Sequence, residues 1–322
     1  MASGVQLRIP AIIGAVCNDW AMRYQPLPAD KFSFDHVYLR MSMPAGERIL
    51  TATPSPQIDL LVGDPDRVFP LASVTKPIAA YAALVAVERG LIGLDDPAGP
   101  PGSTVRQLLS HTSGLPFAKG DPIARPARRR IYSNYGFDVL GDYLSERVGM
   151  PIQRWVREAV ADPLGMDTFD LVAGQWPGLK ADAVPGGSIA AEGVASADSI
   201  ARFLMELMVP KLISPALFAA AVKVQFDGLA GVLPGYGKQQ NNQWGLGFEI
   251  RGHKDPHWLS SDFSPETIGH FGQAGSFIWM DTEVRRPDGS IWCEAGLFLG
   301  ERRYGRAHLE LWPELTAQMR AL

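Results

Sequence analysis

An apolar segment near residue 80 constrains this chain more than any other feature. Every side chain from Ile78 to Val87 is apolar or aromatic, polar residues return at Glu88 and Arg89, and Gly90 follows. A helix that is apolar on all sides is normally buried, and this run is too short for a membrane span, which needs about 20 residues. The segment therefore predicts a helix in the centre of a globular domain, closed by a left-handed glycine.

Ser73 and Lys76 stand at the start of this predicted helix, and Pro77 is tolerated in a first turn. Residues three apart on a helix share one face, with Cβ atoms about 5–6 Å apart, so the amine can reach the hydroxyl. The helix N-terminus adds N–H groups that could hold an oxyanion, and a desolvated amine can act as a base. The pair indicates a nucleophile and its base. The alternative is a helix-capping serine beside a first-turn surface lysine.

Two downstream motifs favour the catalytic interpretation. Tyr132-Ser133-Asn134 is the one Tyr-x-Asn of the chain, and His270-Phe271-Gly272 is its one Lys/His-x-Gly. In order and spacing the three motifs resemble those of the serine β-lactamase, penicillin-binding-protein and related esterase superfamily, most closely its class C-like branch. The resemblance extends from about residue 69 to about 280. It includes the sequence around residues 69–77, 109–115, 131–137, 163–166, 193–198, 244–250 and 269–272.

The resemblance implies a role for each catalytic residue. Ser73 Oγ would attack an acyl carbonyl, and Lys76 would take or share its proton. Tyr132, if its phenol lies between two cations, would be a better base than a free phenol and could return the proton to the leaving group. Asn134 would orient Lys76 and hydrogen-bond the substrate.

The third motif would lie on a strand beside the cleft. There His270 replaces the more usual lysine, and Gly272 belongs to the same substrate-binding edge. The oxyanion hole would consist of the backbone amides of Ser73 and Gln273. No metal or organic cofactor is needed for this chemistry.

The resemblance also implies an α/β (α+β) β-lactamase/transpeptidase-like fold, in which helices flank an antiparallel sheet and the active site lies in a cleft beside an inserted helical domain. We expect a discontinuous sheet domain of residues 1–98 and 193–322, and a helical domain of residues 99–192. The hydrophobic pattern predicts strands at 11–17, 36–41, 49–53, 245–251, 277–284 and 291–298. It predicts helices capped by Ser103 and by Ser196, a helix along 137–148 that ends at Gly149, and further helices from 152 and along 309–322.

The composition and charge of the chain exclude some classes of binding partner. A net charge of −4 and a pI near 5.9 argue against nucleic acid as a partner. Cys17 and Cys293 have neither metal-ligand spacing nor the pattern of a disulfide framework. Residues 9–17 are too short and too weakly basic at their start for a secretory signal, so we expect a cytoplasmic protein without a membrane partner. Its oligomeric state is not specified.

Three further features have competing interpretations. His111 could be a base, but the resemblance favours a structural turn. The arginines between Arg125 and Arg130 could be a solvated loop or an electropositive rim of the site. Residues 186–190 approach the Gly-x-Ser-x-Gly pattern of an α/β-hydrolase around Ser188 but lack the last glycine and a preceding strand.

The sequence thus predicts a serine hydrolase that acts through an acyl-enzyme on a small ester or amide. Lactam-processing relatives carry lysine and a hydroxyl residue in the third motif, and these groups hold the substrate carboxylate. Phe271 cannot donate a hydrogen bond, and His270 is mostly neutral near pH 7. Losing such a contact costs about 1.5–3 kcal/mol. β-Lactamase or D-alanyl peptidase activity is the alternative, and a non-catalytic acyl-ligand sensor of the same fold is the second.

Overall fold

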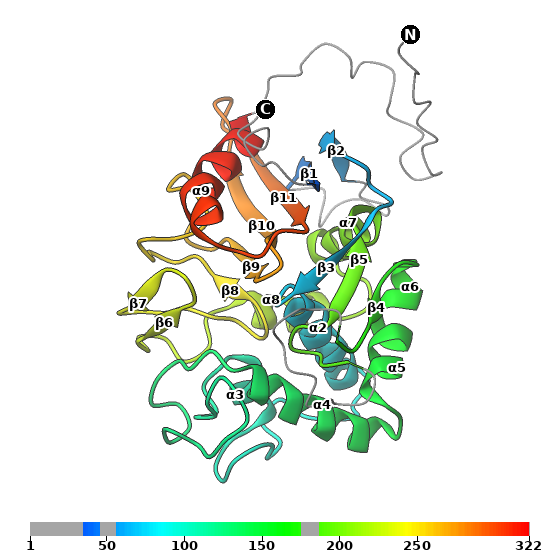
Figure 1. The fold of residues 1–322 in the computed structure, drawn as a ribbon, viewed down its shortest axis with the longest axis vertical. Helices are drawn as coiled ribbons and strands as arrows, with labels where there is room; N and C mark the ends of the chain where they lie inside the picture. Colours follow the sequence, from blue (N-terminus) through cyan, green and yellow to red (C-terminus); the bar gives the residue numbers. More distant parts are fainter. Residues whose placement is uncertain (1–34, 46–55, 175–186, 322) are drawn as a thin grey trace.

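The computed structural model describes residues 35–45, 56–174 and 187–321. Its main element is a six-stranded antiparallel sheet in the order β2-β1-β11-β10-β9-β8 (Figure 1). These strands are β1 (His36–Pro44), β2 (Gln57–Val62), β8 (Glu249–Ile250), β9 (Ile268–Gly272), β10 (Ser276–Arg285) and β11 (Ile291–Gly300). Strands from the two ends of the sequence thus pair in one sheet, which confirms the antiparallel sheet expected for this fold class.

The two faces of the sheet are covered by different helices. The C-terminal helix α9 (Arg306–Ala321) packs Trp312, Leu315 and Met319 on one face. On the other face, α7 (Ala197–Met208) buries Phe203 and Leu204 against the sheet, and its first turn is capped by Ser196 as predicted. The sheet is therefore flanked by helices on both sides.

Helix α2 (Thr75–Glu88) lies in the interior, as its sequence predicts. All its side chains from Thr75 to Ala86 are buried, and Gly90 has a left-handed φ of 69° just after its end. The preceding strand β3 (Val68–Ala72) belongs to a second sheet of order β3-β5-β4, with β5 (Gly193–Ser196) and β4 (Asp170–Leu171). Ser73 is thus placed between the end of β3 and the start of α2.

Further helices lie below and beside α2 in Figure 1. They are α3 (Val105–Leu109), α4 (Asn134–Val148), α5 (Ile152–Val156), the π-helical turn η3 (Arg157–Ala161) and α6 (Asp162–Leu164). Helix α4 buries Phe137, Leu140 and Leu144 and ends at the left-handed Gly149, as predicted. The remaining elements are α8 (Pro215–Val222) and the hairpin of β6 (Gly231–Leu233) and β7 (Gly237–Gln239). The boundaries proposed for the two domains remain a prediction.

Two local expectations are wrong. Residues 245–251 form a strand at Glu249 and Ile250 alone, because the preceding turn presses against α2: a Cβ on Gly247 would lie 2.0 Å from the Ala80 Cβ. Helix α3 is capped by Thr104 rather than Ser103, since Thr104 and Gln107 form a reciprocal capping box. The strands predicted at 11–17 and 49–53 lie outside the described residues.

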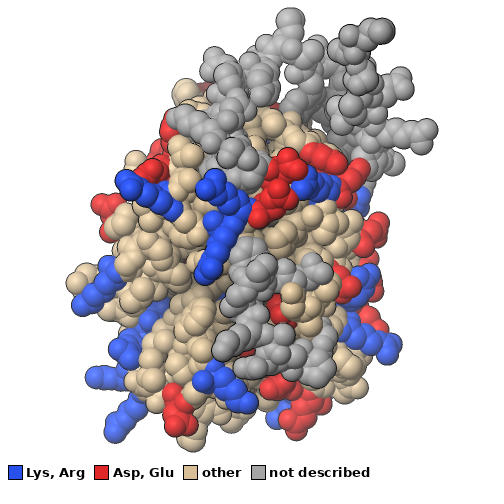
Figure 2. Space-filling view, viewed as in Figure 1, with Lys and Arg blue, Asp and Glu red and all other residues tan. Residues whose placement is uncertain are grey.

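Basic and acidic side chains are interspersed on the face shown in Figure 2. Among the helices described, none has both the length and the apolar character that crossing a membrane requires.

Candidate active site

A cavity of about 340 Å³ opens onto Ser73. The structure gathers five of the predicted site residues in its wall: Ser73, Tyr132, Asn134, His270 and Gln273. Lys76 hydrogen-bonds the serine, and Gly272 is buried beside Ser73. Further lining residues are Ala72, Phe117, Ala191, Pro234, Trp244, Glu249, Phe271 and Arg303. Residues more than 190 positions apart in sequence therefore meet at one site.

The Lys76 amine is held by three partners. Nζ lies 3.3 Å from Ser73 Oγ, 2.7 Å from Asn134 Oδ1 and 2.7 Å from the carbonyl oxygen of Ala190. A neutral amine has two N–H groups and one lone pair. It can donate to Asn134 and Ala190 and still accept the proton of the Ser73 hydroxyl. The amine is thus oriented for proton transfer from the serine.

Burial changes the charge of Lys76. Loss of solvent lowers the pKa of its amine to about 7, although the charge of Asp138 opposes this shift. A large fraction of the lysine is therefore neutral at neutral pH, as a base must be.

Tyr132 stands in an aromatic enclosure. Its ring centroid lies 4.7 Å from that of His111 and 5.8 Å from those of Trp244 and His270, while Lys76 Nζ lies 4.7 Å from the ring centre. Burial raises the pKa of the phenol, and the charge of Glu249 raises it further, against the opposing effect of a hydrogen bond with Ser73. Tyr132 is therefore a phenol rather than a phenolate.

His270 does not provide a second positive charge that would lower the pKa of Tyr132. Burial, together with the nearby Lys76, lowers the pKa of the His270 imidazole to about 3, so the ring is neutral. Its Nδ1 lies 2.7 Å from the Phe271 carbonyl oxygen. A carbonyl can only accept, so we assign the proton to Nδ1 and the lone pair to Nε2. The condition stated for Tyr132, a phenol between two cations, is therefore not met.

The backbone amides of Ser73 and Gln273 are suited to an oxyanion. In the described part of the chain, neither N–H donates to a turn or loop carbonyl. Strand β9 can approach Ser73 closely because residue 272 is glycine: a Cβ there would lie 2.3 Å from the Leu71 carbonyl oxygen and 3.1 Å from the Ser73 nitrogen. Gly272 therefore brings the end of β9 against the nucleophile.

Two loop residues turn out to be structural. His111 is buried at a left-handed φ of 57°, and its Nδ1 accepts the Ser133 N–H, so it stabilises a turn. Arg130 is also buried, and it donates to the carbonyls of Ser110, Gln225, Phe226 and Asn242. For Arg130, both the solvated loop and the electropositive rim are therefore wrong.

Ser188, the alternative nucleophile, is hydrogen-bonded to acidic side chains. Ser188 Oγ donates to Asp138 Oδ1, and its backbone N–H donates to Glu192 Oε2. It lies in a turn before β5, not between a strand and a helix. This arrangement contradicts an α/β-hydrolase elbow.

Several residues of the cavity wall have no counterpart in the predicted set. Glu249 is buried among Lys254 (3.1 Å), His257 (2.9 Å) and Trp258 (2.9 Å). Burial opposes its ionisation, but these partners hold the pKa of the carboxyl well below its usual range. The sequence signal that could have identified Glu249 is its position in the 244–250 segment, which resembles the superfamily. Phe117 and Arg303 lie in loops, where single residues give no periodic signal.

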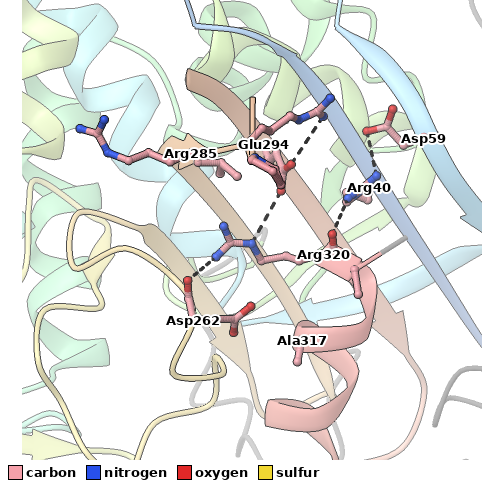
Figure 3. A pocket seen from close by; sticks show the side chains of 11 residues that line it. Arg40, Asp59, Asp262, Arg285, Glu294, Ala317 and Arg320 are labelled. Atoms are coloured by element: carbon pink, nitrogen blue, oxygen red, sulfur yellow. Dashed lines mark hydrogen bonds and ion pairs between the residues drawn. The ribbon is translucent and has the colours of Figure 1, made fainter. Parts of the chain in front are cut away.

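A larger cavity, of about 700 Å³, lies at the sheet and α9 and is lined by charges (Figure 3). Arg320 Nε faces Glu294 Oε2 at 3.7 Å, and Arg40 pairs with Asp59 at 3.4 Å. Its described lining contains no serine, cysteine or lysine that could act as a nucleophile or base. The charges pair with one another, so the chemistry is assigned to the Ser73 cavity. Nowhere in the described chain do three potential metal ligands cluster.

Comparisons with known proteins agree with this geometry. A family model described as Beta-lactamase matches residues 63–287. The crystal structure of a beta-lactamase (Mb2281c) from Mycobacterium bovis is 40% identical, with a TM-score of 0.77, and the match covers 91% of this chain and 97% of that one.

Two curated relatives match over a shorter length. Penicillin-binding protein 4* of Bacillus subtilis (strain 168) is 30% identical over an alignment of 132 residues, and the match covers 31% of this chain and 29% of that protein. Esterase EstB of Burkholderia gladioli is 30% identical over an alignment of 156 residues, and the match covers 34% of this chain and 40% of EstB. The match thus spans less than half of either relative.

Proposed function

Because the chain belongs to the beta-lactamase family, we propose that it is a serine hydrolase that forms an acyl-enzyme at Ser73 on a small ester or amide. The observation that carries this proposal is the position of the Lys76 amine, 3.3 Å from Ser73 Oγ with its other hydrogen bonds already made. An acyl-ligand sensor would need the same base to become acylated, so hydrolysis of the acyl-enzyme, not its formation, distinguishes an enzyme from a sensor.

In the proposed reaction, Ser73 Oγ attacks the acyl carbonyl carbon while its proton passes to the lone pair of Lys76. The amides of Ser73 and Gln273 hold the resulting oxyanion. Tyr132, still a phenol, gives its proton to the leaving oxygen or nitrogen and is reprotonated by the Lys76 ammonium. The bond to the leaving group breaks, and water attacks the acyl-enzyme by the same steps in reverse.

The cavity wall supports an uncharged substrate. His270 presents no charge, Phe271 offers no donor side chain, and the Glu249 carboxylate lies close by. These groups do not replace the lysine and hydroxyl that hold a lactam carboxylate. We therefore place esters and amides ahead of lactams.

Lactam hydrolysis stays the second candidate, because the Mycobacterium bovis protein of 40% identity is described as a beta-lactamase. Arg303 at the cavity is a cation that could contact a carboxylate. Parallel kcat/KM measurements on short acyl esters, D-amino-acid amides and nitrocefin separate the candidates. Nitrocefin turnover well above ester turnover would reverse this order.

The test of the proposal is covalent labelling. A fluorophosphonate should add mass to the peptide that contains Ser73, and Ser73→Ala should abolish both the adduct and ester turnover. Ser188→Ala should still be labelled at Ser73. An adduct on Ser188 in the wild type would contradict the assignment. The cytoplasmic location stays a prediction, which cell fractionation tests.

A further inference from the structure

One carboxyl group beside the catalytic lysine has no role in the proposed reaction. Asp138 lies on α4 one helical turn after Asn134, which itself binds the Lys76 amine. Its side chain is half-buried, and its charge acts on Lys76 across the interior of the site. None of the three sequence motifs includes it.

A chain of hydrogen bonds also connects Asp138 to the lysine. Ser188 Oγ donates to Asp138 Oδ1 and accepts the N–H of Ala190, at 3.0 Å. The carbonyl of Ala190 in turn accepts from Lys76 Nζ at 2.7 Å. Asp138 can therefore affect the Lys76 amine in two ways. Its negative charge acts on the amine directly, and its hydrogen bond to Ser188 helps to fix the turn that presents the Ala190 carbonyl to Lys76.

The other groups around the amine carry no compensating charge. Tyr132 is a phenol, and burial lowers the pKa of both His111 and His270, so these rings are neutral. Among the described residues, the Asp138 carboxylate is the group whose charge raises the pKa of Lys76.

Asp138 itself faces further acids. Burial raises the pKa of its carboxyl, and the charges of Asp142 and Glu192 add to this effect, while Ser188 and Lys76 oppose it. Asp142 is exposed and lies one turn further along α4. It therefore offers a matched control on the same helix.

We propose that Asp138 is a positioning residue that stabilises the protonated form of the Lys76 amine and, through Ser188, holds the Ala190 carbonyl against it. Without this carboxylate, burial alone would keep the lysine neutral at lower pH. Asp138 would thereby set the lower pH limit of activity. This consequence for turnover rests on the proposed function, whereas the effect on the charge of Lys76 does not.

The variant Asp138→Asn tests the charge while keeping an oxygen that accepts from Ser188. NMR titration of protein labelled with ¹³C-lysine should show the Lys76 midpoint fall by roughly one pH unit, as expected for loss of a nearby opposite charge. The acid limb of kcat/KM should move down equally. At pH 6, activity relative to the alkaline plateau should then be about fivefold higher than in the wild type.

Two further variants separate charge from position. Asp142→Asn should leave both the titration and the pH profile unchanged. Ser188→Ala keeps the carboxylate, so the Lys76 midpoint should not fall, but kcat should drop severalfold because the Ala190 carbonyl is no longer fixed.

An unchanged Lys76 midpoint in Asp138→Asn, or an equal shift in Asp142→Asn, would overturn the charge effect. Wild-type kcat in Ser188→Ala would overturn the positioning effect, and this variant is informative even if Asp138→Asn does not fold. The titration needs no turnover. A shifted midpoint in a protein whose Ser73 is never acylated would support this inference while contradicting the proposed function.

Discussion

At the scale of single residues, the charge of Lys76 decides when the site can work. Because the pKa of Lys76 is about 7 and the pKa of Tyr132 is raised, the two groups titrate in well-separated pH ranges. The neutral amine is needed as the base, and the phenol is needed in its protonated form. The two requirements are met together above neutral pH.

We therefore expect kcat/KM to rise with pH through an apparent pKa of about 7 and then to stay level. A bell-shaped profile is expected where a phenolate is the base beside a second titrating cation, which His270 does not supply. The measurement is kcat/KM for a neutral ester between pH 5 and pH 9.5, with enzyme stability checked at each pH. A fall in activity between pH 7 and pH 9 would show that a protonated cation is required.

The same buried lysine should cost stability. The folded pKa of about 7 lies below the ordinary lysine pKa of 10.5, so the unfolded chain binds more protons between these two pH values and stability rises with pH across that window. Lys76→Met, which has a similar volume and no charge, should raise the free energy of unfolding at pH 7 by about 1–4 kcal/mol. The gain should shrink toward pH 10.5. Urea unfolding at both pH values measures it, and an equal gain at each would argue against a charge effect.

At the scale of elements, Arg130 joins segments that lie far apart in the sequence. Its guanidinium binds carbonyls in the turn after α3, in the loop after α8 and in the segment before β8. The backbone of Arg130 also bridges Gly231 at the start of the β6–β7 hairpin. The hairpin leads to Pro234 in the cavity wall, so Arg130 supports the site from behind.

Arg130→Met should lower the free energy of unfolding by at least about 3 kcal/mol, because buried carbonyls lose their donors. Arg128→Met, at an exposed position two residues earlier, should change it by less than about 0.5 kcal/mol. Thermal or urea unfolding compares the two variants. Equal losses in both would mean that the buried hydrogen bonds are not the cause.

At the scale of the whole molecule, the fold class was predicted from the resemblance of the motifs to a known superfamily, whereas the main helices and strands were predicted from local patterns. The interior helix α2, the capped helix α7 and the strands β10 and β11 each have a periodic pattern or a marked end. The neutral state of His270 near pH 7 was predicted, but the strong lowering of its pKa and the burial of Arg130 could not be predicted in this way. Both depend on carbonyls and rings brought close by the fold, and spacing along the chain contains no information about them.

The pairing of β1 with β11 also affects how the chain folds during its synthesis. About 250 residues separate the two strands along the chain, and synthesis at 5–20 residues per second needs about 12–50 s to produce the second. During that interval α2 and β1 exist without the strands that bury them, and a nascent chain with exposed apolar segments is prone to aggregate. The nucleophile is therefore made early but acquires its cleft late, so the yield of active protein depends on how well the growing chain is protected at the ribosome.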